Sequence, residues 1–212
     1  METHDIDTGS SSEVTLSRRQ SRLTGQKPPL KLREIWAIRT RLEMAGAIRD
    51  LALFNLAIDS KLRACDLLRL QVKDVANGLT ILSRASIIQR KTGMPVRFEI
   101  TQLTRETLNT LIEHDHLGSN DYLFQSRLHD SPHLSRRQYS RIVKGWVEMI
   151  GLDPTEYGTH TMRRTKPTLI YRRTKNLRAV QLLLGHTKLD STVRYLGIEL
   201  DDALDMAEQT EV

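Results

Sequence analysis

Apolar residues recur at helical spacing from about residue 32 onward. The first four, Leu32, Ile35, Trp36 and Ile38, fit a helix. Segment 47–58, AIRDLALFNLAI, predicts a second helix with a broader apolar face. Segment 59–70, DSKLRACDLLRL, predicts a short third helix with Ser60 as its N-cap. The folded part of the chain is therefore expected to begin with three helices.

Strand-forming residues replace this pattern between residues 79 and 100. They are concentrated in 79–83 (LTILS), 86–91 (SIIQRK) and 94–100 (MPVRFEI). The turn-forming pair Asn77-Gly78 precedes the first run, and Thr92-Gly93 separates the last two. The sequence therefore predicts a small antiparallel sheet with a basic hairpin tip at Lys91.

Helical periodicity then returns and continues almost to the end of the chain. The helical segments are 104–114 (TRETLNTLIEH), 135–151 (SRRQYSRIVKGWVEMIG), a helix opened by 158–165 (GTHTMRRT), 177–186 (LRAVQLLLGH) and 190–196 (DSTVRYL). Gly185 is expected to end its helix, and Asp190 or Ser191 to cap the next one. The predicted fold is mainly α with a small antiparallel β-sheet, an α+β domain.

Composition divides the chain into three parts. Residues 1–29 are rich in Ser, Thr, Gly and charge and end in two prolines, which predicts a flexible leader. Residues 30–198 form the expected folded domain, because they carry the periodic segments. Residues 199–212 are acidic with interspersed apolar positions, which predicts a short amphipathic helix.

Charge indicates a polyanionic partner. The whole chain has a formal charge of +6, yet residues 197–212 hold six acidic residues and no basic one. Residues 1–196 therefore carry 32 basic and 20 acidic side chains, a formal charge of +12. This favours nucleic acid over a membrane surface, since no Lys-rich amphipathic helix or lipidation motif occurs. Solubility alone is the competing explanation for the charge.

The cysteine content and the apolar runs bear on the cellular compartment. Cys65 is the only cysteine, which excludes a disulfide framework and a Cys-His zinc pattern and suits a reducing cytoplasm. The most apolar run, 51–58, is far shorter than the roughly 20 residues of a membrane span. The first residues contain no apolar core typical of a signal peptide. A cytoplasmic protein that is not exported is expected.

Six residues form an ordered set suited to phosphodiester chemistry: Arg63, Lys91, His160, Arg163, His186 and Tyr195. Two arginines can bind the non-bridging oxygens and neutralise charge on a five-coordinate phosphorus. A lysine can protonate the departing 5′ oxygen, and a histidine can accept or share a proton. A tyrosine can attack phosphorus and store the bond as an aryl phosphate ester.

Some of these residues also have a purely structural explanation, and others leave a choice of role open. Tyr195 could pack in the core, and Arg63 could pair with Asp66 on its own helix. Lys91 has a basic neighbour, Arg90, on the same hairpin, so either could face a phosphate. His160 and Arg163 lie three apart at a helix start, which places both on one face and within reach of one anion.

Three segments resemble the conserved boxes of the tyrosine recombinases, the phage integrase family. Segment 62–75, LRACDLLRLQVKDV, resembles the first arginine box, and 160–164, HTMRR, resembles the His-x-x-Arg box. Segment 183–195, LLGHTKLDSTVRY, resembles the box that ends in the nucleophilic tyrosine. The resemblance covers about residues 30–200. The short leader makes the chain similar to the small members that consist of a catalytic domain alone, such as the fimbrial phase-switch invertases.

This resemblance implies a role for each residue of the set. Tyr195 would be the nucleophile that forms a 3′-phosphotyrosyl link, and Arg63, Arg163 and His186 would stabilise the transition state. Lys91 would be the general acid, and His160 would assist proton transfer. Members of the family use no metal, nucleotide or other cofactor, because the covalent link conserves the energy of the broken bond.

The implied function is site-specific recombination, in which DNA is cleaved and rejoined to integrate, excise or invert a segment. Two alternatives remain open: nicking and rejoining like that of a type IB topoisomerase, and a catalytically inactive DNA-binding regulator of the same fold. The resemblance further implies a homotetramer on paired DNA sites, with segment 199–212 exchanged between protomers. DNA-bending accessory proteins and a location on the bacterial nucleoid are also expected.

Two further expectations concern the surroundings of the site. Pro167 departs from the family pattern after the His-x-x-Arg box and should kink or delay the helix there. One predicted helix presents candidates for base contacts in a DNA groove: Arg136, Arg137, Gln138 and Arg141.

Overall fold

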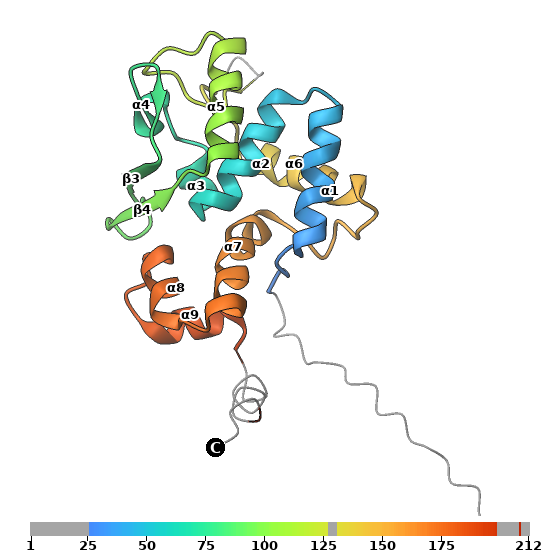
Figure 1. The fold of residues 1–212 in the computed structure, drawn as a ribbon, viewed down its shortest axis with the longest axis vertical. Helices are drawn as coiled ribbons and strands as arrows, with labels where there is room; N and C mark the ends of the chain where they lie inside the picture. Colours follow the sequence, from blue (N-terminus) through green and yellow to red (C-terminus); the bar gives the residue numbers. More distant parts are fainter. Residues whose placement is uncertain (1–25, 127–130, 199–207, 209–212) are drawn as a thin grey trace, which may run out of the picture.

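The computed structural model describes residues 26–126, 131–198 and 208 of the 212-residue chain. Its helices are α1 (Leu32–Met44), α2 (Ile48–Ser60), α3 (Ala64–Leu67), α4 (Val72–Val75), α5 (Gln102–His114), α6 (Arg136–Met149), α7 (Thr159–Thr174), α8 (Leu177–Leu184) and α9 (Leu189–Leu196). The predicted fold class, mainly α with small antiparallel β-structure, is confirmed (Figure 1). Within the described residues, no helix has the length and apolar character of a membrane span.

The β-structure consists of two separate two-stranded ladders where one small sheet was predicted. Strands β1 (Ala76–Asn77) and β2 (Thr80–Ile81) pair around Gly78, whose positive φ of 61° suits glycine. Strands β3 (Arg84–Ile88) and β4 (Pro95–Glu99) pair in antiparallel register. The loop between β3 and β4 carries Lys91, and Figure 1 shows this hairpin reaching toward α8.

Helix α2 is the centre of the main hydrophobic core. All of its residues from Ala52 to Ser60 are buried, and it packs against α1, α5 and α7. The ring of Phe54 meets Trp146 of α6 edge to face, with 5.3 Å between their centroids. The extended apolar run that predicted α2 therefore reflects a helix covered on several sides.

Helices α7, α8 and α9 gather at one end of the molecule, the lower part of Figure 1. Their apolar contacts form a second, smaller cluster around Tyr171, Val180 and Leu184. Tyr195 is only partly buried and packs at the edge of this cluster. Helix α9 is thus held by far fewer buried side chains than α2, so its displacement costs less free energy than unpacking α2 would.

The structure corrects two predicted helix starts. Ser60 is the last residue of α2, and Arg63 is the N-cap of α3. Between them, Lys61 adopts the left-handed conformation at φ +55° and its side chain is fully buried. Helix α9 begins at Leu189 with Lys188 as N-cap, so Asp190 lies in the first turn, where its carboxylate favours the helix dipole. Local sequence signals for caps were present in both places, but tertiary packing moved the boundary.

Pro167 does not delay α7, which was one of the two effects expected of it. The helix runs from Thr159 to Thr174 with Pro167 buried in its interior. Proline removes one backbone donor from a helix, but packing against α2 holds the flanking turns in place. The neighbouring Lys166 contributes to that packing through its side chain.

Four charged groups tie α7 to α2 and β4. Lys166 Nζ lies 2.6 Å from Asp59 Oδ1 and 2.7 Å from Glu99 Oε1. Lys61 Nζ lies 2.7 Å from Glu99 Oε2 and donates to the carbonyl of Asp59. Burial opposes the charged forms of both carboxylates, but the lysines outweigh it and lower the pKa values of Asp59 and Glu99. This charge cluster joins the segment just before Arg63 to the helix that carries Arg163.

Replacing Lys166 with methionine should lower the free energy of unfolding by about 3 kcal/mol, because Asp59 is 3% exposed and would lose its cationic partner. The pKa values of Asp59 and Glu99 are depressed, so the stabilisation is complete above their unfolded values near 4 and is lost progressively as pH falls through the lower folded values. Urea unfolding at pH 7 and pH 3 measures both effects. The difference in free energy of unfolding between wild type and Lys166→Met should be smaller at pH 3 than at pH 7. The exposed control Lys144→Met should leave the free energy of unfolding nearly unchanged. Equal losses in the two variants would contradict the cluster's role.

Candidate active site

Arg63 is held at the start of α3 by a buried partner on the β3–β4 hairpin. Its Nη1 donates to Gln89 Oε1 at 2.7 Å, and Gln89 is almost fully buried. Asp66, one turn after Arg63, accepts from the backbone N–H of Arg90 at 3.1 Å. The β3–β4 hairpin therefore contacts the start of α3 twice, once through Arg63 and once through Asp66.

Arg163 lies in α7 with only 4% of its surface exposed. Its Nη2 donates to the carbonyl of Leu184, the last residue of α8, at 3.0 Å. Its Nη1 is buried and has no hydrogen-bond partner within the described part of the chain. One nitrogen thus anchors the guanidinium while the other remains available to an anion.

A pocket of about 750 Å³ brings four of the six candidate residues together. Its lining comprises Arg63, Ala64, Cys65, Lys91, Ser135, Arg136, Arg137, Thr159, His160 and Arg163. The pKa of His160 is lowered, first by partial burial and then by the nearby cations Arg163 and Arg164. His160 is therefore neutral near pH 7 and able to accept a proton.

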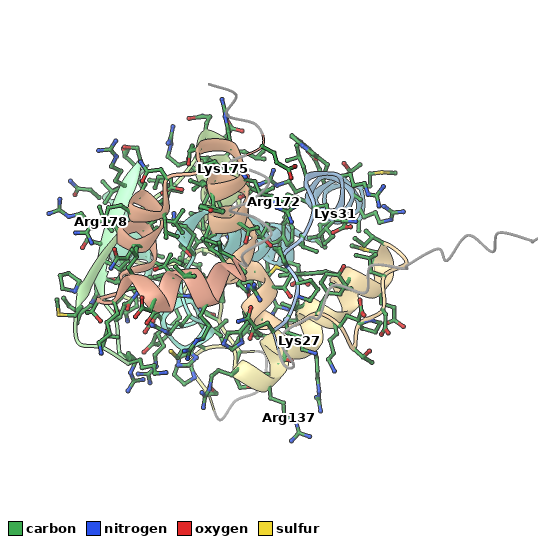
Figure 2. All side chains as sticks on the ribbon, turned by 90° about the horizontal axis from the view of Figure 1, so that it is seen from below. Lys27, Lys31, Arg137, Arg172, Lys175 and Arg178 are labelled. Carbon is green, nitrogen blue, oxygen red and sulfur yellow. The ribbon has the colours of Figure 1, made fainter. Side chains whose placement is uncertain are left out.

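Arg136 and Arg137 enlarge the positive charge of this pocket from the start of α6. From the sequence alone, these two residues were candidates only for base contacts in a groove. Two adjacent basic residues at a helix start were a sequence signal for a phosphate-binding role, because helix N-termini favour phosphate. Figure 2 shows Arg137 at the edge of the molecule opposite Lys175, with α9 running between them.

Lys91 and Arg90 point to different surroundings. Lys91 lines the pocket that contains Arg63, His160 and Arg163. Arg90 lines the adjoining pocket, which Lys91 also borders, and it is absent from the lining of the first. The arrangement favours Lys91 as the basic residue of the hairpin that faces the two arginines.

Tyr195 and His186 lie beside this pocket and do not line it. The Tyr195 ring meets the His186 ring edge to face, with 5.4 Å between their centroids. The Arg163 guanidinium carbon lies 6.0 Å from the Tyr195 ring centroid. The Tyr195 hydroxyl is buried without a hydrogen-bond partner in the described residues, and Tyr195 borders a second pocket that contains Gln26 and Arg194. The arginine and the tyrosine are neighbours, but the hydroxyl does not open into the arginine pocket.

Burial raises the pKa of Tyr195 to about 12, although Arg163 and Arg164 oppose the rise. The phenol is therefore neutral at physiological pH in this arrangement. The same two arginines would stabilise a phenolate or a phosphate ester formed at this oxygen.

Arg164 is a further buried cation at Tyr195 whose position the sequence did not indicate. It is 7% exposed, and its guanidinium carbon lies 5.5 Å from the Tyr195 ring centroid. Its Nη1 donates to the carbonyl of Lys27, and Gln26 donates to the carbonyl of Arg194. Residues 26–30 thus cross from α7 to α9 and contact the turn that precedes Tyr195.

The helical fold, with a cationic pocket beside a tyrosine, has the features expected of an enzyme that breaks and rejoins phosphodiester bonds. Residues 30–200 match the model of the phage integrase family, and the chain therefore belongs to that family. The expected tyrosine recombinase membership is confirmed. No group of three or more His, Cys, Asp or Glu side chains that could hold a metal occurs among the residues described above.

Known proteins similar to this chain bear related names. It is 36% identical over 153 residues to the probable integrase/recombinase YoeC of Bacillus subtilis, covering 72% of this chain and 80% of that protein. It is 27% identical to tyrosine recombinase XerC of Herpetosiphon aurantiacus, covering 74% of this chain and 50% of that protein. The crystal structure of XerA recombinase superposes with a TM-score of 0.70 at 18% identity, covering 90% of this chain and 65% of that one. This last likeness shows a shared fold.

Proposed function

We propose that this protein is a site-specific DNA recombinase that cleaves a strand by attack of Tyr195 and rejoins it through a 3′-phosphotyrosyl intermediate. The observation that carries the proposal is one cationic pocket formed by Arg63, Lys91, His160 and Arg163, with the Tyr195 phenol packed beside Arg163. The names of its relatives, which include integrase and recombinase, support the same conclusion.

In the proposed cleavage step the Tyr195 oxygen forms a bond to phosphorus as the bond to the 5′ oxygen breaks. Arg63 and Arg163 bind the non-bridging oxygens, and the free Nη1 of Arg163 is suited to that contact. Lys91 protonates the departing 5′ oxygen, while neutral His160 accepts the phenol proton. Rejoining reverses these transfers, so the chemistry needs no cofactor.

The buried Tyr195 hydroxyl must reach the pocket before it can attack. Helix α9 packs on the smaller cluster of α7 and α8 and is the element that would shift. Arg163 and Arg164 favour the phenolate, whereas the anionic scissile phosphate would oppose it, so the phenol needs a proton acceptor as its oxygen attacks.

The proposed substrate is double-stranded DNA in the bacterial cytoplasm, at the nucleoid. We propose a tetramer on paired sites, assisted by DNA-bending proteins, with residues 199–212 exchanged between protomers. That segment lies almost entirely outside the described residues. The positive charge of residues 1–196 is suited to phosphate contacts along such a duplex.

Plasmids carrying two, one or no copies of the DNA that flanks the gene test this proposal. The expected result is recombinant product from the two-copy plasmid alone, because strand exchange requires two sites. Relaxation of the plasmid without a copy would instead favour the topoisomerase alternative. Tight binding with no covalent adduct on any flanking fragment would favour the inactive regulator.

A further inference from the structure

Thr192 lies on α9 one turn before Tyr195 and contacts the second histidine of the site. Its side chain is fully buried, and its Oγ1 lies 3.1 Å from His186 Nδ1. This is the only hydrogen bond of the Thr192 hydroxyl among the described residues. The two residues are therefore paired inside the protein, next to the nucleophile.

The backbone of His186 is held on both sides. Its N–H donates to the carbonyl of Gln181, and its carbonyl accepts from Gln181 Nε2 at 3.0 Å. Gly185, just before it, ends α8 in the left-handed conformation at φ +64°. A fixed backbone and the ring contact with Tyr195 leave the tautomer of the imidazole as the main variable.

His186 is neutral near pH 7 in this environment. Burial and then the cations Arg163 of α7 and Arg63 before α3 lower its pKa to about 4. The phenol of Tyr195 on α9, which contacts the imidazole, is itself neutral. A neutral imidazole has one N–H and one lone pair, so only one of its nitrogens can donate to a phosphate.

The hydroxyl of Thr192 determines which nitrogen that is. If Nδ1 carried the proton, the buried Thr192 hydroxyl would accept it and its own proton would be left without an acceptor. An unsatisfied buried donor costs roughly 1–3 kcal/mol. Donation from Thr192 to the Nδ1 lone pair satisfies both groups and places the ring proton on Nε2.

We propose that Thr192 is a positioning residue that sets His186 in the Nε2–H tautomer, so that this N–H can donate to a non-bridging oxygen of the scissile phosphate. The inference rests on the proposed function and adds a role for a residue that touches neither DNA nor the reacting atoms. Helix α9 carries both Thr192 and Tyr195. The same helix therefore orients the phosphate donor, His186 Nε2–H, and carries the nucleophile.

Thr192→Val, which is nearly isosteric, and Thr192→Ser, which keeps the hydroxyl, test this role in the adduct assay with the full chain. At pH 7.5 the valine variant should form adduct about 10- to 100-fold more slowly than wild type. Removing one hydrogen-bond donor to a transition-state oxygen typically slows a reaction by at least this factor. The serine variant should stay within about threefold of wild type. DNA affinity should be the same in all three proteins.

The dependence on pH separates this role from a structural one. Protonation makes both nitrogens of His186 donors. Because the pKa of His186 is about 4, the ratio of the valine variant's rate to the wild-type rate should rise only as pH falls from 5 toward 4. A ratio that is constant over this range, or a serine variant as slow as the valine variant, would overturn the proposal.

Nitrogen NMR of the labelled histidines tests the tautomer without any reaction. The His186 signals are assigned by their loss in His186→Gln, since the chain has seven histidines. Wild type should show protonated Nε2, and Thr192→Val should shift the population toward protonated Nδ1. The same tautomer in both proteins would overturn the proposal. A wild type that forms no adduct yet shows this shift would contradict only the proposed function.

Discussion

Tyr195→Phe should abolish the covalent protein–DNA adduct while DNA affinity stays within about threefold. The substitution removes only the oxygen that forms the bond to phosphorus, and the ring keeps its contacts with His186 and Arg163. The hydroxyl makes no hydrogen bond of ordinary geometry in the described residues, although Arg163 lies close enough to lower its pKa, so its removal should cost the folded state little. Fragments of flanking DNA, nicked so that the released 5′ end diffuses away, trap the adduct for a denaturing gel.

Tyr139→Phe is the matched control for this experiment. The Tyr139 hydroxyl is also buried without a partner in the described residues, but it lies in α6, where its ring contacts Trp146. This variant should form adduct at the wild-type rate. Persistence of the adduct in Tyr195→Phe would show that another residue is the nucleophile and would refute the proposed mechanism.

Arg163→Lys should slow cleavage by about 10²- to 10³-fold with a small change in DNA affinity. One nitrogen of the arginine is bound to the carbonyl of Leu184, and the other is free for a phosphate oxygen. An ammonium group is a single centre and cannot serve both positions, even though the charge is conserved. Single-turnover cleavage rates at saturating protein measure the effect, and thermal unfolding verifies that the variant folds.

Arg137→Lys is the control for charge alone. Arg137 lies at the rim of the same pocket and is exposed, so lysine can replace it as a phosphate contact. Its cleavage rate at saturation should remain near wild type. If Arg163→Lys weakened binding but cleaved normally when saturated, Arg163 would be a binding residue and would have no role in the transition state.

Periodicity predicted most helices, because an amphipathic helix carries its pattern within a few consecutive turns. Segments 47–58 and 104–114 correspond closely to α2 and α5, and Gly185 ends α8 as expected. The predicted helix starts were wrong where several neighbouring residues have similar free energies as the N-cap. Ser60 is a good N-cap by type, yet burial of Lys61 with Glu99 extends α2 through it.

The candidate site shows the same division between local and long-range information. Residue types and spacing were sufficient to select Arg63, Lys91, His160 and Arg163, which the fold gathers around one pocket. The contacts of Gln89 with Arg63, and of Arg164 with Tyr195, had no local signal. Each joins residues that are distant along the chain, so neither follows from spacing.

The sequence by itself determined the family, the helical fold class and the order of the chemical groups, because these depend on motifs and periodicities within short segments. Only the tertiary structure decided the burial, the pKa values and the contacts of those groups. It buries the Tyr195 hydroxyl, raises its pKa to about 12, and places Thr192 on His186. Burial and charge act through space over a few ångströms, and only the folded chain sets those distances.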